Sequence, residues 1–398
     1  MTMQQPLVPV LATPAPVPAS APTADAASSR LASIDIVRGL AIISIIGVDQ
    51  LAWALRGIVG DEPSAFASLS RSVAAQFEHA EWEGFRFYDL ILPLLIFTTG
   101  ASVVFSLSKE REHKDLLQSY WRVMRRAALL YALGIAYYGG LTAAWPDIRL
   151  LGVLQRIAIC YLVASLLFLQ VPVRALVALV VALLLGYWAA FELISVDEVQ
   201  AGIYLPEANL AHWVDRQFLP GRLWYQTWDP EGMLSTVPAI ATCLLGVLAA
   251  LVLRRDGIAP AHKAGLLVLC GVAALALGHV WGLRFPVIKT LWTSSYVLVA
   301  GGYSLLLLGL AYCVGEIWRM GGALKVFVWI GANAIALYLL EGVIGFSKLA
   351  ERLLGSEITM RLDAMRPGAA ATASAVLGLT LAICLARFLY ARRLFLRV

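Results

Sequence analysis

The chain has 398 residues, of which 60% are hydrophobic and 14% charged, and its mean hydropathy is +0.77. This is far more apolar than a soluble globular domain, so the composition excludes that class and indicates an integral membrane protein. The net charge of +5 does not point to nucleic acid, because the basic residues lie in short segments between apolar runs and form no extended basic stripe.

The first thirty residues are rich in Pro, Ala, Thr and Ser and have no cationic n-region. Prolines are scattered through their apolar part, which argues against a signal peptide. We therefore predict a disordered tail over residues 1–29, followed by one transmembrane domain over residues 30–398.

Apolar runs long enough to cross a hydrocarbon core of about 30 Å recur along the rest of the chain. They are continuous and rich in Leu and Ala, without the alternation of an outer-membrane β-barrel. The sequence therefore predicts an all-α polytopic membrane protein with about ten transmembrane helices. The predicted spans are 36–55, 87–108, 123–140, 150–170, 173–194, 234–254, 264–283, 291–314, 324–346 and 370–391.

Lys and Arg near the span ends orient the chain, because short cytoplasmic loops keep the excess of these residues. Basic clusters open the first span, follow the second and sixth spans and close the chain, whereas loops 56–86 and 195–233 carry more acidic than basic residues. Both termini are therefore predicted in the cytoplasm and these two loops outside.

The five cysteines all lie in predicted spans and show no metal-ligand or CxxC spacing, so neither a disulfide nor a metal site is expected. No GxSxG, Walker, HExxH or Rossmann motif occurs in the sequence. Nothing in it indicates a redox cofactor or nucleotide hydrolysis.

Ionisable side chains within a span cost about 2.5–3.5 kcal/mol at the membrane centre, so they usually face a cavity or a partner. Asp49 lies toward the outer end of the first span, and Asp89 opens the second span from outside, where an acid also suits the helix dipole. Arg156 lies two turns beyond Arg149 and roughly 10 Å deeper, and we expect it to face an internal cavity rather than to snorkel.

The segment FEHAEWEGFRFYDLILP at 77–93 concentrates titratable residues at the predicted outer entrance of the second span. Histidine is the side chain that titrates near neutrality, which makes His79 the natural general base for a hydroxyl or an amine. The simpler interpretation of this segment is a solvated boundary loop beside interfacial aromatic residues.

The segment WDPEG at 228–232 also has two interpretations. Asp229 as N-cap, Pro230 at the first helical position and Glu231 in the first turn would start the sixth predicted helix. Alternatively Trp228, Asp229 and Glu231 contact a sugar, together with neighbouring aromatic rings that would stack on it.

Five ordered segments resemble a known family, and together they cover most of the chain from residue 30 onward. They are RLASIDIVRGLAIISIIGVD at 30–49, HAEWEGFRFYDLILPLLIFTTGAS at 79–102, LLGVLQRIAICYL at 150–162, WDPEGMLSTVPAIATCLLG at 228–246 and LWTSSYVL at 291–298. They are similar to the membrane acyltransferases related to the lysosomal heparan-alpha-glucosaminide N-acetyltransferase, and in particular to a bacterial branch of that group.

The resemblance implies acetyl transfer from cytoplasmic acetyl-CoA to a saccharide on the other face of the membrane, with a catalytic histidine that His79 matches. The lysosomal enzyme has an asparagine near the end of its first helix, where this chain has Asp49. A carboxylate could orient His79 and stabilise its imidazolium, but it could donate to the acyl oxygen only when protonated.

We therefore expect an acetyl-CoA-dependent acyltransferase of the bacterial inner membrane with its active site toward the periplasm, in contact with membrane lipids and a saccharide acceptor. His79 and Asp49 are the predicted catalytic residues. The predicted substrate-binding residues are Asp89, Arg156, Trp228, Asp229, Glu231, Ser294 and Ser295. The predicted residues for the CoA phosphates are Arg38, Arg122, Arg125 and Arg126.

The alternative function is a transporter or flippase for a glycan or lipid, since intramembrane Asp and Arg also mark transport pathways. The sequence leaves open the acceptor sugar and the choice between O- and N-acetylation. It also leaves open whether an acetyl-histidine forms and whether the chain forms a homo-oligomer.

Overall fold

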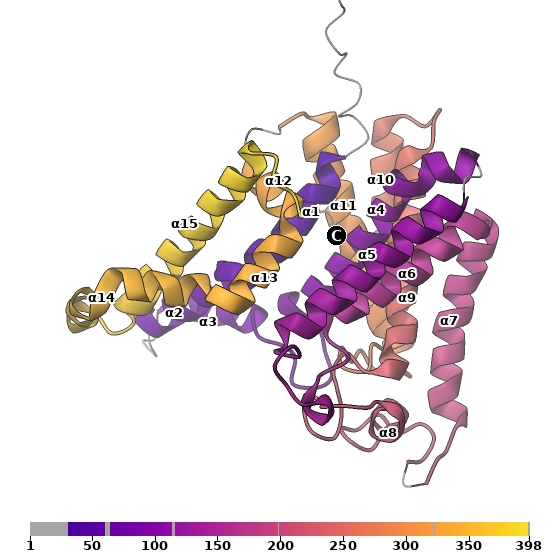
Figure 1. Cartoon of the computed structure of the whole chain (residues 1–398), viewed down its shortest axis with the longest axis horizontal. Coiled ribbons are helices and arrows are strands. Elements are labelled where there is room, and N and C mark those ends of the chain that lie inside the picture. Colours follow the sequence, from indigo (N-terminus) through magenta and orange to yellow (C-terminus); the bar gives the residue numbers. More distant parts are fainter. Residues whose placement is uncertain are drawn as a thin grey trace, which may run out of the picture. The chain divides into compact units, whose positions relative to one another are not determined.

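The computed structural model describes residues 31–59, 64–113, 116–197, 199–320, 322 and 324–396 (Figure 1). The predicted tail over residues 1–29 lies outside the described residues. From Ala32 onward the chain forms one compact unit. The described residues form helices joined by turns and loops with three isolated β-bridges, so the all-α prediction is confirmed.

The first half of the chain holds α1 (Ala32–Ile43), η2 (Ser44–Val48), α2 (Asp49–Val59), α3 (Ala65–Gln76), η3 (Phe87–Leu90), α4 (Ile91–His113), α5 (Leu116–Tyr137), η4 (Trp145–Asp147), α6 (Val153–Gln170) and α7 (Val173–Leu193). The second half holds α8 (Leu210–Phe218), α9 (Met233–Arg254), α10 (Pro260–Gly282), α11 (Ser294–Tyr312), η5 (Cys313–Ile317), α12 (Lys325–Ala332), α13 (Ala334–Ile344), α14 (Phe346–Met365) and α15 (Ala369–Ala391).

Within the described part of the chain, seven helices are long and apolar enough to cross a membrane, so the protein is a polytopic membrane protein. They are Phe87–Glu112, Val153–Gln170, Val173–Leu193, Met233–Arg254, Pro260–Gly282, Ser294–Ile317 and Ala369–Ala391. Each overlaps a predicted span. The total of about ten and the cytoplasmic placement of both termini stay predictions.

The other three predicted spans are helical but interrupted or charged. The first passes from α1 to α2 through the π-helical segment Ser44–Val48. The third, α5, carries three arginines in its first half. The ninth is the pair α12 and α13, which bends by 77° at Asn333 and would count as an eighth span if the pair crosses the membrane together.

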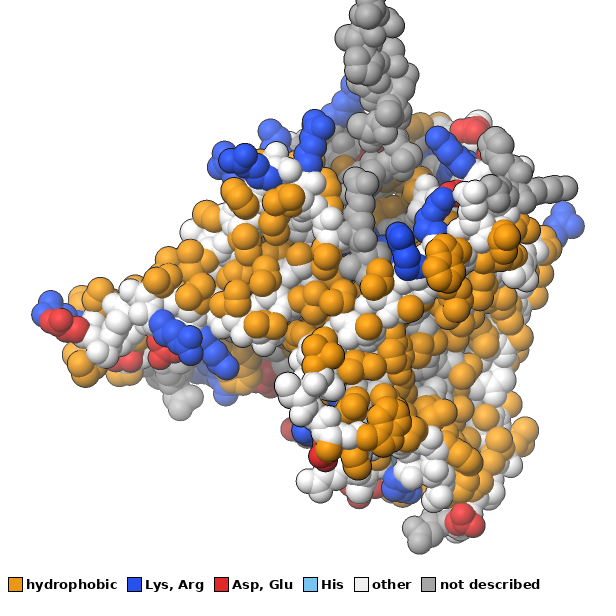
Figure 2. Space-filling view, viewed as in Figure 1, with side chains coloured by type: hydrophobic (Ala, Val, Ile, Leu, Met, Phe, Trp, Pro, Cys, Tyr) orange, Lys and Arg blue, Asp and Glu red, His pale blue; other side chains and the backbone are white. Residues whose placement is uncertain are grey.

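Helix α4 lies among other helices and contacts α1, α6, α9 and α11. Figure 1 shows α12 to α15 grouped with α1 and α2, while α4, α5, α6 and α9 lie side by side. Hydrophobic side chains cover the broad middle of the face seen in Figure 2, and Lys and Arg gather along its upper edge. This distribution is the one expected where helices meet hydrocarbon between two polar layers.

Two glycines let α4 and α9 approach until their backbones touch. A Cβ atom on Gly100 would lie 1.9 Å from the carbonyl oxygen of Cys243, and one on Gly246 would lie 1.9 Å from that of Phe97. Small residues at such crossings allow close van der Waals packing, which drives helix association in membranes. The crossing fixes α4, which follows Asp89, against α9, which carries Ser235.

We expect Gly246→Ala to lower the free energy of unfolding by about 1–3 kcal/mol, because the added methyl group forces the two backbones apart. The matched control is Gly186→Ala on α7, since Gly186 is exposed and has no atom within 4 Å of an added Cβ. Thermal unfolding of both purified variants in one detergent measures the difference. Equal midpoints for the two variants would contradict the close packing.

Candidate functional site

The loop that carries His79 is held against the loop between α10 and α11. The backbone N–H of Gly84 donates to the carbonyl oxygen of Val287 at 2.9 Å, and Glu83 and Ile288 form an antiparallel bridge. Two loops some two hundred residues apart in sequence thus lie side by side.

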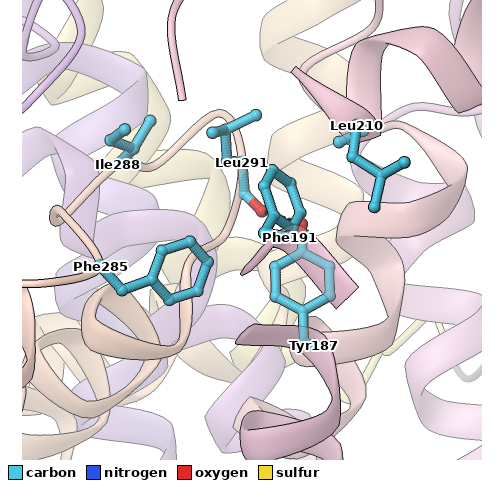
Figure 3. Close-up of a cluster of buried hydrophobic side chains, with 7 residues drawn as sticks. Tyr187, Phe191, Leu210, Phe285, Ile288 and Leu291 are labelled. Carbon is cyan, nitrogen blue, oxygen red and sulfur yellow. Dashed lines mark hydrogen bonds between the residues drawn. The ribbon is translucent and has the colours of Figure 1, made fainter. Parts of the chain in front are cut away.

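A cluster of apolar side chains anchors the second loop, and we call it the outer hydrophobic cluster (Figure 3). Phe285, Ile288 and Leu291 are fully buried in it. They pack with side chains from α7 and α8, which are Tyr187, Phe191, Leu210 and Ala211. The Tyr187 hydroxyl donates to the carbonyl oxygen of Leu291 at 2.6 Å, so the cluster also satisfies a backbone group of the loop.

The hydroxyls of Ser294 and Ser295 fix the same loop to its surroundings. Both residues are fully buried; Ser294 donates to the carbonyl oxygen of Leu184 at 2.7 Å, and Ser295 donates to that of Phe285 at 2.5 Å. Because each hydroxyl already donates to a backbone carbonyl, it could offer a substrate only an acceptor lone pair, and the predicted role of these serines in substrate binding stays a prediction.

His79 and Asp89 form the centre of the candidate site. His79 Nδ1 lies 2.9 Å from Asp89 Oδ1, and the other carboxylate oxygen accepts the backbone N–H groups of Ala80 at 3.2 Å and Arg86 at 3.0 Å. Asp89 is fully buried, whereas the His79 side chain is 51% exposed. An ionised carboxylate only accepts hydrogen bonds, so this contact favours the tautomer with the proton on Nδ1 and the lone pair on Nε2.

Lys289 completes this group, and we call His79, Asp89 and Lys289 the charged trio. Its Nζ lies 2.8 Å from Nδ1 and 3.0 Å from Nε2 of His79, and 3.6 Å from Asp89 Oδ1. Burial lowers the pKa of the Lys289 amine, although the nearby carboxylates of Asp89 and Glu231 act in the opposite direction.

Lys289 was not among the residues predicted from the sequence, since it belongs to no motif and lies 210 residues from His79. One signal was available, because a lysine in a short loop on the predicted outer side runs against the cytoplasmic excess of Lys and Arg.

Asp49 is separated from His79 in space by the side chain of Tyr88. The Tyr88 hydroxyl donates to Asp49 Oδ2 at 3.0 Å, and the Tyr88 ring lies 4.8 Å from the His79 ring, centroid to centroid. The carboxylate in direct contact with His79 is therefore Asp89, where the sequence analysis expected Asp49. The catalytic role of Asp49 stays a prediction.

A second buried charged group, the Arg149 cluster, lies at the start of the segment leading into α6. Arg149 donates to Asp229 through Nε at 2.8 Å and Nη2 at 2.6 Å, and to Glu231 Oε2 at 2.6 Å. Its guanidinium also lies 4.5 Å from the ring centroids of both Tyr138 and Trp224. Burial alone would lower the pKa of Arg149, but the two carboxylates raise it.

The Arg149 cluster corrects the expectation that Asp229 caps the sixth predicted helix. That helix, α9, begins at Met233, and its N-cap is Gly232. The Asp229 carboxylate is instead occupied by Arg149 and by the backbone N–H groups of Trp224 and Glu231. Sugar binding by Asp229 and Glu231 stays a prediction that would compete with these bonds.

Arg156 is fully buried inside the helix bundle, as the sequence analysis expected. Its Nη2 donates to Ser235 Oγ at 2.5 Å and to the carbonyl oxygen of Gly232 at 3.3 Å, and its guanidinium lies 4.7 Å from the Trp292 ring. Among the described residues, Nε and Nη1 have no hydrogen-bond partner. Arg156 therefore retains two donors for an oxygen atom from water or from a ligand.

The Trp228 ring is already stacked within the protein. It lies 4.3 Å from the His212 ring at 8° and 4.3 Å from the Tyr225 ring at 27°. Glu207 donates its backbone N–H to His212 Nδ1 at 3.1 Å, and burial lowers the pKa of His212 to about 3, so this imidazole is neutral. A saccharide that stacks on Trp228 would have to use ring surface left between these neighbours.

The four arginines predicted for CoA differ in their surroundings. Arg38 Nη2 donates to Ser102 Oγ at 2.6 Å and to the carbonyl oxygen of Thr98 at 3.3 Å, so it joins α1 to α4. On α5, Arg122 pairs with Glu110, Arg125 is exposed, and Arg126 lies 4.8 Å from the Tyr161 ring. Binding of CoA phosphates by these residues stays a prediction.

Two curated proteins are similar to this chain in sequence. No protein-family model matches the chain. Human heparan-alpha-glucosaminide N-acetyltransferase is 25% identical to it over 368 residues, which cover 78% of this chain and 52% of the human protein. The mouse protein of the same name is 24% identical over 375 residues, which cover 80% of this chain and 54% of the mouse protein.

The chain is related to the heparan-alpha-glucosaminide N-acetyltransferases. It spans about half the length of these two curated relatives. The relationship confirms the resemblance that the five sequence segments carry.

We expect Arg149→Met to lower the free energy of unfolding by about 3–5 kcal/mol, because two buried carboxylates lose their cation. Adding Asp229→Asn and Glu231→Gln to that variant should recover part of the loss, since those changes remove the stranded charges. Thermal unfolding measures both effects, with Arg174→Met, at an exposed position on α7, as the control. A single variant as stable as the control would contradict the buried pairing.

The buried carboxyl group of Asp215 should make the stability of the fold depend on pH. It is buried in α8 and accepts the backbone N–H of Met233 at 2.8 Å, and burial raises its pKa to about 6 from the ordinary 3.8. A raised carboxyl pKa contributes stability that is fully present below pH 3.8 and is lost as pH rises through 6.

Asp215→Asn should therefore exceed the wild type in unfolding free energy by up to about 3 kcal/mol at pH 7, and this advantage should shrink toward pH 4. Unfolding midpoints of both proteins across that pH range measure it. A difference that is constant with pH would show that the pKa of Asp215 is not raised in the folded protein.

Proposed function

We propose that the protein is a membrane acetyltransferase that transfers an acetyl group from acetyl-CoA to a hydroxyl or amine of a saccharide. The observation that carries this proposal is the contact between the buried Asp89 carboxylate and Nδ1 of the half-exposed His79, which orients an imidazole that can act as a base. Relatedness to two N-acetyltransferases supports the reaction class.

In the proposed reaction, His79 Nε2 takes the proton from the acceptor hydroxyl or amine as the acceptor oxygen or nitrogen attacks the thioester carbonyl carbon. The new C–O or C–N bond forms, the C–S bond breaks, and the CoA sulfur leaves as a thiolate that takes the proton from the imidazolium. Asp89 stabilises the imidazolium through Nδ1 and keeps the ring oriented. A route through acetyl-histidine would use the same nitrogen as nucleophile.

For the remaining parts of the site we propose roles in binding. Arg156 offers two unpaired donors for an oxygen of the acceptor or of the acyl group, and Arg125 offers an exposed guanidinium for a CoA phosphate. We propose a bacterial inner membrane because the sequence resembles a bacterial branch of the family. The distribution of Lys and Arg between the loops supports an orientation with His79 toward the periplasm and acetyl-CoA supplied from the cytoplasm.

One observation favours the alternative of a transporter or flippase. The 77° bend between α12 and α13 interrupts an apolar stretch at Asn333, and broken helices occur at the binding sites of secondary transporters. A transporter would move its glycan or lipid across the membrane without consuming acetyl-CoA.

Purified protein in nanodiscs, supplied with radiolabelled acetyl-CoA and a panel of periplasmic oligosaccharides, tests the proposal. We expect label in a saccharide with the wild type, a rate about 10²–10⁴-fold lower with His79→Ala, and a comparable loss with Asp89→Asn. His279→Ala is the matched control, because His279 is exposed on α10 and its Nδ1 contacts only its own helix backbone among the contacts described.

If the His79→Ala variant labels the saccharide at the wild-type rate, His79 is not the catalytic base. Folded wild-type protein that moves a glycan across the membrane and leaves acetyl-CoA intact would replace the acetyltransferase by the transporter.

A further inference from the structure

We propose that Lys289 is a positioning residue that keeps His79 unprotonated, and therefore competent as a base, by holding a positive charge beside both ring nitrogens. This inference rests on the proposed function only where it concerns catalysis. The effect on His79 itself can be measured without any turnover.

The amine of Lys289 lies directly beside the imidazole of His79. Its Nζ lies within 3.0 Å of both His79 ring nitrogens and 3.6 Å from Asp89 Oδ1, so the lysine and the histidine share one carboxylate. Two cationic groups beside a single buried carboxylate repel each other, and protonation of one disfavours protonation of the other.

The backbone around Lys289 is held firmly enough to keep the charge in place. The neighbouring Ile288 and the nearby Leu291 are fully buried in the outer hydrophobic cluster (Figure 3). The bond from Gly84 to Val287 ties the same loop to the loop that carries His79. A lysine on a freely moving loop would spread its charge over many positions, whereas this one is kept at the imidazole.

Other charged groups around His79 are engaged with one another. In its own loop, Glu78 pairs with Arg86 at 2.9 Å and with Arg56 at 3.3 Å. Arg86 Nη1 also donates to the backbone carbonyl oxygen of His79 at 3.3 Å. From α2, Asp49 reaches the ring only through the hydroxyl of Tyr88.

The contacts therefore single out the charged trio. Within the described part of the chain, Lys289 is the cation whose nitrogen contacts the ring nitrogens of His79, and Asp89 is the carboxylate that does so.

The charge has a consequence at each stage of the proposed transfer. Before reaction, repulsion by the Lys289 ammonium keeps a lone pair on His79 Nε2 for the acceptor proton. After the acceptor attacks and the C–S bond breaks, the same repulsion makes the imidazolium a stronger acid, so its proton passes readily to the departing CoA thiolate. Lys289 itself neither gains nor loses a proton over the cycle.

Carbethoxylation of His79 by diethyl pyrocarbonate tests the inference, because this reagent attacks only the unprotonated imidazole. The extent of modification of the peptide containing His79 is measured by mass spectrometry across pH 5 to 9. We expect Lys289→Met to raise the midpoint of this profile by about one pH unit or more, because the neighbouring positive charge is gone. Lys289→Arg, which keeps the charge, should stay near the wild-type midpoint.

The control is Lys325→Met, which removes an exposed lysine of α12 and should leave the midpoint unchanged. A Lys289→Met midpoint equal to that of the wild type, in protein with a normal unfolding transition, would overturn the inference. So would a rise of the same size in the control, since the effect would then be one of net charge.

Activity separates this inference from the proposed function. If the wild type transfers acetyl groups, the acid limb of its pH–rate profile should move upward in Lys289→Met by the same interval as the modification profile. If the wild type never consumes acetyl-CoA, the proposed function is wrong. The role of Lys289 is then decided by the modification experiment alone.

Discussion

A carboxylate buried in an apolar membrane protein must find donors for both of its oxygens, and Asp89 meets this constraint where two loops and α11 come together. Its oxygens bind His79 and two backbone N–H groups of the same loop, and Lys289 approaches from the loop before α11. The Tyr296 hydroxyl of α11 donates to the backbone carbonyl oxygen of Asp89 at 2.7 Å. Removing the charge would therefore take away the partner of the imidazole and weaken the contacts of the carboxylate with both loops.

The Arg149 cluster obeys the same constraint with a different outcome. Its guanidinium and two carboxylates use one another's hydrogen-bonding capacity and lie almost wholly buried. His79 is also paired with Asp89, but half of its side chain is exposed and can be reached from outside the protein. A closed network stabilises a fold, whereas a paired group with one open position is suited to chemistry.

The sequence predicted the helical fold well because long apolar runs leave a membrane chain little choice but helix. It also located His79, Asp89 and Arg156, because charged residues at the edge of such runs stand out against their surroundings. It could not show that Lys289 also lies beside His79, since Lys289 is brought there by the packing of Ile288 and Leu291. Spacing along one segment carries no information on a contact made between distant loops.

The two carboxylates near His79 act in different ways. Asp89 bonds the imidazole directly, so its charge acts on the proton at Nδ1. Asp49 accepts from the Tyr88 hydroxyl, and the Tyr88 ring lies against the imidazole, so Asp49 affects His79 by restraining the ring that packs on it. An asparagine side chain also has an oxygen that can accept the hydrogen bond from the Tyr88 hydroxyl. The carboxylate that contacts the imidazole directly is the one at Asp89.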